Sequence, residues 1–367
     1  MSLTIVLGTR PEIIKCAPVV HEAQRRGVPC VIIHTGQHYT PELDELFFHE
    51  LDLPAPVVNL NVGSLPPAKQ VAAMMDRLYD AFLERPPSVV LVQGDTNSVL
   101  AGALTAHKMN VPVAHLEAGL RSDDWDMPEE GNRVLAGNVA DIHFCPTDVQ
   151  RIRLATEGVT EGVHVVGNTV VDAARHYVGK AMSSSTVLDA LGLTPGTFAL
   201  LTMHRPSNVD EPGRLGDLVA CLEAVASSQG WKIAFPVHPR TEAALKASGL
   251  WERLEASTTF VLSRPVGYLD LLRLQENAAL ILTDSGGVQE EANILRVPCV
   301  TLRANTERPE TIKAGGNILF AGSDVDALMA VVKEMTSKPR DWECPFGDGR
   351  TSERVMDILK PYLGTDI

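Results

Sequence analysis

Short runs of β-branched and other apolar residues alternate with longer amphipathic stretches along almost all of this 367-residue chain. Such alternation is typical of parallel sheets, because each crossover between parallel strands needs a connection long enough to hold a helix. We therefore predict an α/β fold. In the first half we expect strands at residues 3–7, 30–34, 88–93, 111–115, 142–145 and 164–166. In the second half we expect them at residues 198–203, 232–237, 259–262, 279–282 and 299–302.

The length of the chain predicts more than one domain. Single hydrophobic cores stop growing at roughly 250–300 residues, and this chain is longer, with 45% apolar residues. We expect two Rossmann-like domains facing each other across a cleft, at residues 1–170 and 171–350, and a last helix within residues 351–367 that crosses back to the first domain. The Ser-, Pro- and Gly-containing stretch 178–197 is the predicted linker. Gly167 and Asn168 are an alternative, earlier hinge.

Composition excludes several kinds of function. The formal net charge of −14 argues against a general affinity for nucleic acid or anionic membranes, so any anionic ligand must be bound by local groups. The cysteines are widely scattered, and no Cys-x-x-Cys pair or histidine spacing resembles a zinc site. No apolar run approaches the roughly 18 residues of a membrane span. We expect a cytoplasmic protein with reduced cysteines and no bound metal.

A glycine-containing turn predicts a diphosphate site. The apolar run 278–282 leads into Thr-Asp-Ser-Gly-Gly at residues 283–287 and then into a predicted helix. Serine and glycine leave the backbone N–H groups accessible at the helix N-terminus, where the helix dipole favours an anion. Glu290 and Glu291 follow about one turn later, where a carboxylate suits ribose hydroxyls better than phosphate. Taken alone, the segment could equally be an ordinary strand-to-helix turn.

Polar residues also follow other predicted strands, and ligands of open α/β sheets bind at the carboxyl ends of the strands. Asp95 and Glu117 each follow a strand of the first half, and His204 follows a strand of the second. Glu129 and Glu130 begin a predicted helix, where one of them is expected to be structural. Each of these residues also has an ordinary reading: an acid as a helix cap, and the histidine as a structural side chain.

Two cations follow the first strand. Arg10 comes just before Pro11, a preferred first residue of a helix, and Lys15 follows about one turn later. A helix N-terminus with two cations is suited to phosphate oxygens. The alternative is a pair of solvated surface side chains.

Taken together, these motifs resemble one family, the non-hydrolysing UDP-N-acetylglucosamine 2-epimerases. The resemblance covers nearly the whole chain in order, which makes it far more specific than a single glycine-rich turn. It rests on Gly8-Thr9-Arg10-Pro11-Glu12, Thr35-Gly36-Gln37-His38, Gly94-Asp95-Thr96, Glu117-Ala118-Gly119-Leu120-Arg121, Pro128-Glu129-Glu130, Asn132-Arg133, His204-Arg205, Asp284-Ser285-Gly286-Gly287 and Thr306-Glu307-Arg308-Pro309-Glu310.

The resemblance implies a glycosyltransferase-B-type fold, a homodimer, and a reaction that needs neither nicotinamide nor metal. In that reaction UDP leaves the sugar by anti elimination across C1 and C2, and the glycal intermediate takes UDP back to give the manno epimer. The first domain would carry the acidic catalytic residues and the second would bind UDP.

The resemblance also implies roles for individual residues. Asp95, Glu117 and Glu129 match the catalytic carboxylates of the family, without a distinction between acid and base, and His204 matches its catalytic or diphosphate-contacting histidine. The implied substrate-binding residues are Arg10, Lys15, Ser285, Gly286, Gly287, Glu291 and Arg308.

The chain departs from the family pattern after His204-Arg205, where many members have Arg-Glu-Asn and this chain has Pro206-Ser207-Asn208. A polar contact made by that acid is absent or replaced here. Some bacterial members are activated by a second substrate molecule bound partly near Gln37-His38, and we do not extend that regulation to this chain.

Three other functions remain open. A 2-epimerase of a UDP-2,3-diacetamido uronic acid would share the acidic motifs, and Glu12 weakly favours the simpler substrate over it. A glycosyltransferase of the same fold would share the diphosphate site but need a different acidic set. A noncatalytic UDP-sugar-binding protein would be expected to lack some of the matched acids or the histidine.

Overall fold

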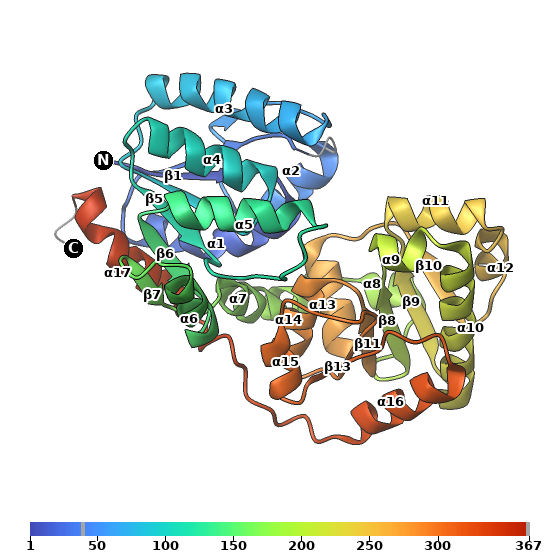
Figure 1. Cartoon of the computed structure of the whole chain (residues 1–367). Helices are drawn as coiled ribbons and strands as arrows, with labels where there is room; N and C mark the ends of the chain where they lie inside the picture. The colour runs from blue at the N-terminus through green and yellow to red at the C-terminus, as the bar shows by residue number, and fades with distance from the viewer. Residues whose placement is uncertain (38–40, 365–367) are drawn as a thin grey trace. The chain divides into compact units, whose positions relative to one another are not determined.

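The computed structural model describes residues 1–37 and 41–364. His38, from one of the family motifs, lies outside the described residues. The chain divides into two compact units, each built around its own parallel sheet (Figure 1). Unit 1 consists of Met1–Ala173 and Phe346–Ile367, and unit 2 of Ala174–Pro345.

The sheet of unit 1 has seven strands in the order β3-β2-β1-β4-β5-β6-β7, and every neighbouring pair is parallel. All five residues of β1 and of β4 are buried, because helices cover both faces of the sheet. The strands are β1 (Leu3–Leu7), β2 (Cys30–His34), β3 (Val58–Asn59), β4 (Val89–Gln93), β5 (Val113–Leu116), β6 (Ile142–Cys145) and β7 (Val163–Val165).

The helices of unit 1 begin with clear sequence signals. Helix α1 starts with a capping box formed by Thr9 and Glu12, and Pro11 lies in its first turn. Figure 1 shows α3, α4 and α5 side by side along the unit. The helices are α1 (Arg10–Arg25), α2 (Pro41–Glu50), α3 (Pro67–Glu84), α4 (Asn97–Lys108), α5 (Pro128–Val139), α6 (Asp148–Thr156) and α17 (Thr351–Leu363). Helix α7 (Thr169–Ser184) begins in unit 1 and continues into unit 2.

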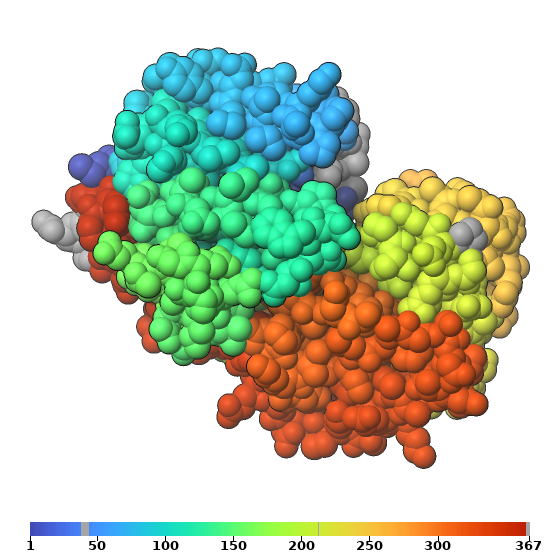
Figure 2. All heavy atoms as spheres, viewed as in Figure 1, coloured from blue at the N-terminus to red at the C-terminus, as the bar shows by residue number. Residues whose placement is uncertain are grey.

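The C-terminal helix α17 is an integral part of unit 1. Asp172 accepts hydrogen bonds from the backbone N–H groups of Thr351 and Ser352, at 3.2 and 2.8 Å. Arg26, the C-cap residue of α1, forms an ion pair with Asp357 at 2.6 Å. Figure 2 shows the red atoms of α17 among the blue and green atoms of this unit. Leu359 is fully buried, so α17 completes the core of unit 1.

The sheet of unit 2 has six parallel strands in the order β10-β9-β8-β11-β12-β13. Its strands are β8 (Phe198–Thr202), β9 (Lys232–Pro236), β10 (Phe260–Ser263), β11 (Leu280–Thr283), β12 (Cys299–Thr301) and β13 (Asn317–Leu319). Its helices are α8 (Val187–Ala190), α9 (Pro206–Val209), α10 (Pro212–Gln229), α11 (Pro239–Ala247), α12 (Trp251–Glu255), α13 (Tyr268–Asn277), α14 (Gly286–Ile294), α15 (Pro309–Lys313) and α16 (Val325–Ser337).

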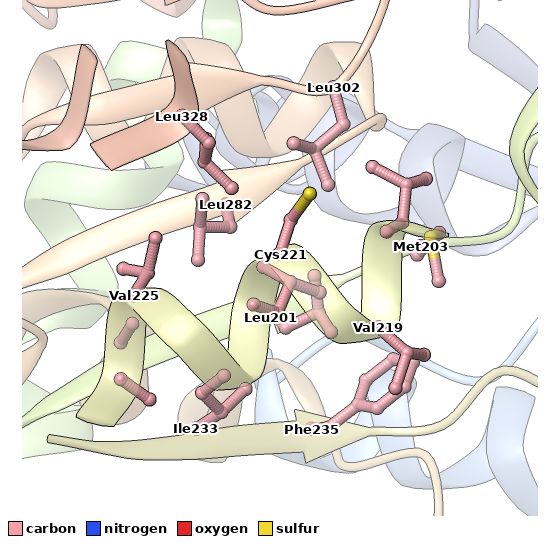
Figure 3. Packing of buried hydrophobic residues seen from close by; sticks show 14 of the residues in the cluster. Leu201, Met203, Val219, Cys221, Val225, Ile233, Phe235, Leu282, Leu302 and Leu328 are labelled. Carbon is pink, nitrogen blue, oxygen red and sulfur yellow. The ribbon is translucent and has the colours of Figure 1, made fainter. Parts of the chain in front are cut away.

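One face of the unit 2 sheet forms a large hydrophobic core. Figure 3 shows side chains of α10, among them Val219 and Cys221, gathered with Phe235 of β9, Leu282 of β11 and Leu328 of α16. All of these side chains are almost completely buried. Burying that much apolar area fixes the sheet rigidly beneath the loops that follow its strands.

The predicted α/β class is confirmed, and each of the eleven predicted strands coincides with an observed strand to within two residues. The short strands β3 and β13 were not predicted. The predicted linker at residues 178–197 is wrong: it contains the end of α7 and all of α8, and Leu188 and Leu193 are buried in the core of unit 2. The division between the units falls inside α7 instead. The predicted hinge residues Gly167 and Asn168 lie within unit 1.

Candidate active site

Four of the sequence-predicted site residues lie where a sheet reverses its strand order. In both sheets the chain starts in the middle, proceeds to one edge and then returns to continue in the other direction, so the switch points are β1/β4 and β8/β11. The turns after β1 and β4 carry Arg10 and Asp95, and the turns after β8 and β11 carry His204 and Ser285. Ligands of doubly wound sheets bind in the crevice at this position.

Glu117 is a buried carboxylate of unit 1 that three side chains hold. Lys15 of α1 lies 2.5 Å from its Oε1, and Asn168 donates to the same oxygen at 2.7 Å. Gln93, the last residue of β4, donates to Oε2. The side chain is buried, and its backbone has φ of 61°, in the left-handed region that a non-glycine residue rarely adopts. Such strain is found where the surrounding structure fixes a functional side chain.

The structure therefore brings Lys15 and Glu117 together, 102 residues apart in sequence. Lys15 is buried as well. Its predicted role beside a phosphate stays a prediction. What the geometry adds is a cation that compensates the buried charge of Glu117, without which that charge would be costly.

Asp95 is held in a more open setting. Arg133 of α5 contacts its Oδ2 at 2.6 Å, while the Asp95 side chain is 31% exposed. The same guanidinium binds Glu130 at 2.6 Å. Arg133 thus ties the turn after β4 to the first turn of α5.

The two glutamates at the start of α5 have different surroundings. Glu130 is buried and accepts hydrogen bonds from the backbone of Ser122 and Asp123, each at 3.0 Å. Although burial raises its pKa, these bonds and Arg133 hold the pKa of Glu130 below its ordinary value. Glu129 is only half-buried, and its side chain makes no hydrogen bond or ion pair within the described residues. Glu130 is therefore the structural member of the pair.

Glu12 connects the turns after β1 and β4. Its Oε2 accepts from the N–H groups of Gly8 and Thr9, both at 2.7 Å, and its Oε1 accepts from the hydroxyl of Thr96 at 2.6 Å. Burial raises the pKa of Glu12 to about 7, although the hydrogen bonds oppose this shift. Because the carboxyl group is committed to these internal bonds, Glu12 is not placed to distinguish one sugar from another.

Arg10 lies beside the same turn. It is half-buried, and its guanidinium carbon lies 5.9 Å from the centre of the Phe47 ring. Phe47 itself is buried in α2. The aromatic ring gives the guanidinium a fixed support at the start of α1.

In unit 2, Asp284 organises the turn that carries His204. This carboxylate is fully buried, and it accepts hydrogen bonds from the backbone of His204 and of Arg205 and from the amide of Asn208. Its Oδ1 lies 3.1 Å from Nδ1 of His204. Burial raises the pKa of Asp284, but the bonds from His204, Arg205 and Asn208 outweigh it and lower the pKa below the ordinary value. A carboxylate on Nδ1 orients the imidazole and leaves Nε2 to face a ligand.

The glycine turn after β11 has the geometry of an anion site. Ser285 is the N-cap of α14, and the helix begins at Gly286. A Cβ atom added at Gly286 or Gly287 would meet no atom within 4 Å, so there is open space above both backbones. The N–H groups of a helix N-terminus next to open space favour an anion.

Two further predicted substrate-binding residues follow the glycine turn in the sequence. Glu291 of α14 is buried and accepts from the amide of Gln275 at 2.7 Å. Arg308 is nearly buried, and its Nε donates to Glu290. Glu290 therefore holds the guanidinium of Arg308, whereas Glu291 is bonded to Gln275.

Sequence reasoning missed the partners that hold these groups. Gln93, Asn168 and Arg133 fix the two carboxylates of unit 1, and Asp284 fixes His204. One signal was present: Gln93 is an amide at the end of an otherwise apolar strand. The others are long-range contacts that no local pattern reveals.

The described residues contain neither a metal-binding group of side chains nor a helix that could span a membrane. In residues 1–37 and 41–364, no three or more His, Cys, Asp and Glu side chains form a group that could bind a metal ion. No helix in that part of the chain has the length and apolar character needed to cross a membrane.

Two doubly wound units, with a diphosphate-type turn in one and fixed carboxylates in the other, define a nucleotide-sugar enzyme of the glycosyltransferase-B fold type. Comparison with known proteins is more specific. A sequence model described as UDP-N-acetylglucosamine 2-epimerase matches residues 21–360. The UDP-N-acetylglucosamine 2-epimerase of Methanocaldococcus jannaschii is 45% identical, with 98% of this chain and 99% of that protein aligned. The chain belongs to the UDP-N-acetylglucosamine 2-epimerase family, whose members are isomerases.

Two further relatives bear on the substrate. The crystal structure of the M. jannaschii UDP-GlcNAc 2-epimerase in complex with UDP-GlcNAc and UDP superposes with a TM-score of 0.91, at 45% identity, and covers 98% of this chain and 100% of that one. A UDP-2,3-diacetamido-2,3-dideoxy-D-glucuronate 2-epimerase of Pseudomonas aeruginosa is 37% identical, with 98% of this chain and 99% of that protein aligned.

Proposed function

We propose that this enzyme interconverts UDP-N-acetylglucosamine and UDP-N-acetylmannosamine by inverting C2 of the sugar. The observation that carries the proposal is the set of carboxylates in unit 1, with buried Glu117 held against Lys15 and partly exposed Asp95 held by Arg133. A simple binding protein has no need of a strained, buried carboxylate. The reaction proceeds by anti elimination of UDP to a glycal and re-addition of UDP to the opposite configuration.

Unit 2 is assigned to the UDP group. The N–H groups of Gly286 and Gly287, with Ser285, face the open space at the start of α14 and suit the diphosphate. Arg308 adds a guanidinium for a phosphate oxygen, and Glu291 a carboxylate for the ribose hydroxyls. His204, oriented by Asp284, is suited to donate a hydrogen bond to the leaving diphosphate. UDP leaves more readily as its charge is stabilised, because the C1–O bond breaks toward an anion.

Unit 1 is assigned to the sugar chemistry. The C2 proton is not flanked by a carbonyl group, so cleavage of the C1–O bond should lead and leave an oxocarbenium-like centre. Glu117, whose two oxygens are both fixed by hydrogen bonds, is suited to stabilise that positive charge. Asp95 and Glu129 are more exposed and are suited to remove the proton from one face and return it to the other. Arg10 and Lys15 remain the proposed cations on the phosphate side.

Proton NMR of the purified enzyme with UDP-N-acetylglucosamine in heavy water, without added cofactor, tests the proposal. We expect the manno epimer to appear with deuterium at C2, and traces of free UDP and glycal to reveal the intermediate. Tight binding of UDP without exchange at C2 would rule the reaction out for this substrate.

A second candidate substrate is a UDP-2,3-diacetamido uronic acid. The P. aeruginosa relative acts on such a compound, and its identity to this chain is 37% against 45% for the M. jannaschii enzyme. Glu12, which the sequence suggested as a weak discriminator, is internally bonded and offers no support for either substrate. Assaying both UDP-sugars under the same conditions separates the two, and higher kcat/KM for the uronic acid would reverse the assignment.

We further propose that the enzyme is a homodimer. The outer sides of α3 and α5 expose large apolar side chains, with Tyr79 at 49%, Leu83 at 57% and Leu135 at 50% exposure. Both helices pack against α4, and exposed apolar residues on the two of them favour association. Light scattering after size-exclusion chromatography should give twice the chain mass of 39.7 kDa, and a single-chain mass across micromolar concentrations would refute the dimer.

A further inference from the structure

A cluster of polar side chains, most of them buried, lies behind the glycine turn of unit 2. Its buried members are Gln289 of α14, Thr301 of β12, Thr311 of α15 and Asn317 of β13, and Thr306, in the segment before α15, is partly buried. Gln289, Thr301 and Thr311 are fully buried, and Asn317 is 2% exposed. Buried polar groups are costly unless they are hydrogen-bonded, so this cluster needs a reason to be there.

The cluster contains a continuous chain of hydrogen bonds. The backbone N–H of Arg308 donates to the hydroxyl of Thr306 at 3.1 Å, and that hydroxyl donates to Oε1 of Gln289 at 2.7 Å. Nε2 of Gln289 then donates to the backbone carbonyl of Ser285 at 3.2 Å. These hydrogen bonds connect the backbone of Arg308, a predicted phosphate-binding residue, to the backbone of the glycine turn.

The orientation of Gln289 is fixed by its neighbours. Its Oε1 also accepts from Nδ2 of Asn317 at 3.3 Å, and Asn317 is itself bonded to Thr301 and Thr311, at 2.9 and 3.0 Å. A flipped amide would place an NH₂ group against the amide of Asn317 and an oxygen against the carbonyl of Ser285. Both contacts are repulsive, so only one arrangement satisfies the cluster.

Arg308 is held at both ends by α14. Glu290 binds its guanidinium, while Gln289, the preceding residue of the helix, holds its backbone through Thr306. Neither Gln289 nor Thr306 carries a charge, and the hydroxyl and amide atoms of this chain are committed to one another. Gln289 and Thr306 therefore fix the position of Arg308 and do not attract an anion themselves.

We propose that Gln289 and Thr306 are positioning residues for the diphosphate: they set the distance between Arg308 and the glycine turn so that both can bind one ligand. This inference rests on the proposed function, because it takes Arg308 and residues 285–287 as the diphosphate site. A charged donor that is already in position raises the affinity for the ligand more than a mobile donor does, because a mobile donor loses conformational entropy when the ligand binds.

The test measures UDP affinity by calorimetry in Thr306→Val, Thr306→Ser, Arg308→Ala and the double variant Thr306→Val/Arg308→Ala. Valine keeps the shape of threonine but removes the hydroxyl, and we expect UDP to bind about tenfold more weakly. Serine keeps the hydroxyl and should restore the affinity. If Thr306 acts through Arg308, the double variant should bind no more weakly than Arg308→Ala alone.

A matched control and a second variant complete the test. Thr336→Val removes a hydroxyl that donates only within α16, to the carbonyls of Val332 and Lys333, and should leave UDP affinity unchanged. Thr306→Ala replaces Thr306→Val if the latter folds poorly. Melting temperatures of all variants separate lost stability from lost affinity.

The outcomes are distinguishable. Wild-type affinity in Thr306→Val, with weakened binding in Arg308→Ala, overturns the positioning role and leaves the proposed function intact. Full additivity of the two substitutions also overturns it, because Thr306 would then act independently of Arg308. Unchanged affinity in Arg308→Ala removes Arg308 from the diphosphate site and overturns that part of the proposed function together with this inference.

Discussion

Replacing Glu117 with glutamine should damage both the stability and the activity of the enzyme, and the two losses can be separated. The substitution leaves the geometry nearly unchanged but removes the negative charge that faces Lys15 at 2.5 Å. Both side chains of this pair are less than a tenth exposed. The ammonium group of Lys15 then stays buried but loses the negative charge of Glu117.

The magnitude follows from that burial. Breaking a buried ion pair by removing one partner costs about 3–5 kcal/mol. A glutamine at position 117 keeps one acceptor oxygen, to which Asn168 can still donate, but its NH₂ group takes the place of the oxygen that accepts from Gln93, so the neighbouring amides do not offset the loss. Removing both charges with Lys15→Met/Glu117→Gln should restore the free energy of unfolding to within about 2 kcal/mol of the original value, since an apolar replacement of a buried pair is often neutral.

Turnover should respond differently. If Glu117 stabilises positive charge at C1, its loss slows the reaction by about 10²- to 10³-fold in the single variant and by at least as much in the double variant, which also lacks the proposed phosphate-side cation Lys15. Urea unfolding measures stability, and the NMR assay measures turnover. As a control, Lys246→Met/Glu242→Gln removes an exposed ion pair and should change the free energy of unfolding by at most about 1 kcal/mol.

Two results would refute this reasoning. A Glu117→Gln variant as stable as the original enzyme would show that the charge of Lys15 is compensated by something other than Glu117. A double variant with normal turnover would show that the reaction does not need the negative charge at position 117.

Three further predictions concern the other polar groups. Asp95→Asn should lower kcat by about 10²-fold or more, whereas its free energy of unfolding should fall by only about 1 kcal/mol, because the ion pair of Asp95 is partly exposed. A drop in kcat no larger than the loss of folded protein explains would argue against a role of Asp95 in proton transfer. Gly286→Val should fold normally, since there is room for a side chain, but should raise the Kd for UDP at least about tenfold by filling the anion site; unchanged calorimetric affinity would exclude this turn. The original enzyme should lose stability between about pH 4.5 and pH 7, because the pKa of Glu12 is about 7 in the folded state against 4.5 in the unfolded state, so the folded state binds the proton more tightly. Measured against Glu12→Gln, which does not titrate, its free energy of unfolding should fall by on the order of 3 kcal/mol over this range. Urea unfolding curves that give the two proteins parallel pH profiles would contradict this.

The fold could be predicted from the sequence to the extent that each element carries its own pattern. The buried strands β1 and β4 read as continuous apolar runs, and both were predicted. The strands β3 and β13 have only two and three residues, too few to show any periodicity. Residues 178–197 look like a linker by composition, but their few apolar side chains are buried by long-range packing.

The candidate site shows the same division. Sequence position at the end of a strand was enough to select Asp95, Glu117 and His204. It was not enough to identify their partners, because Lys15 meets Glu117 only after β1, β4 and β5 have paired and α1 has packed on the sheet. Which of Glu129 and Glu130 is structural likewise depended on backbone donors eight and seven residues earlier in the chain.

The position of α17 has a consequence for the order in which the protein folds during synthesis. Unit 2 is one continuous segment, Ala174–Pro345, whereas unit 1 needs both Met1–Ala173 and Phe346–Ile367. Domains usually complete their folding from the N-terminus as the ribosome proceeds. Here the first unit to be translated is the last that can be finished, since its core lacks Leu359 until the final helix leaves the ribosome. A truncation of a few turns at the C-terminus should therefore unfold the unit that contains the N-terminus and leave unit 2 able to fold.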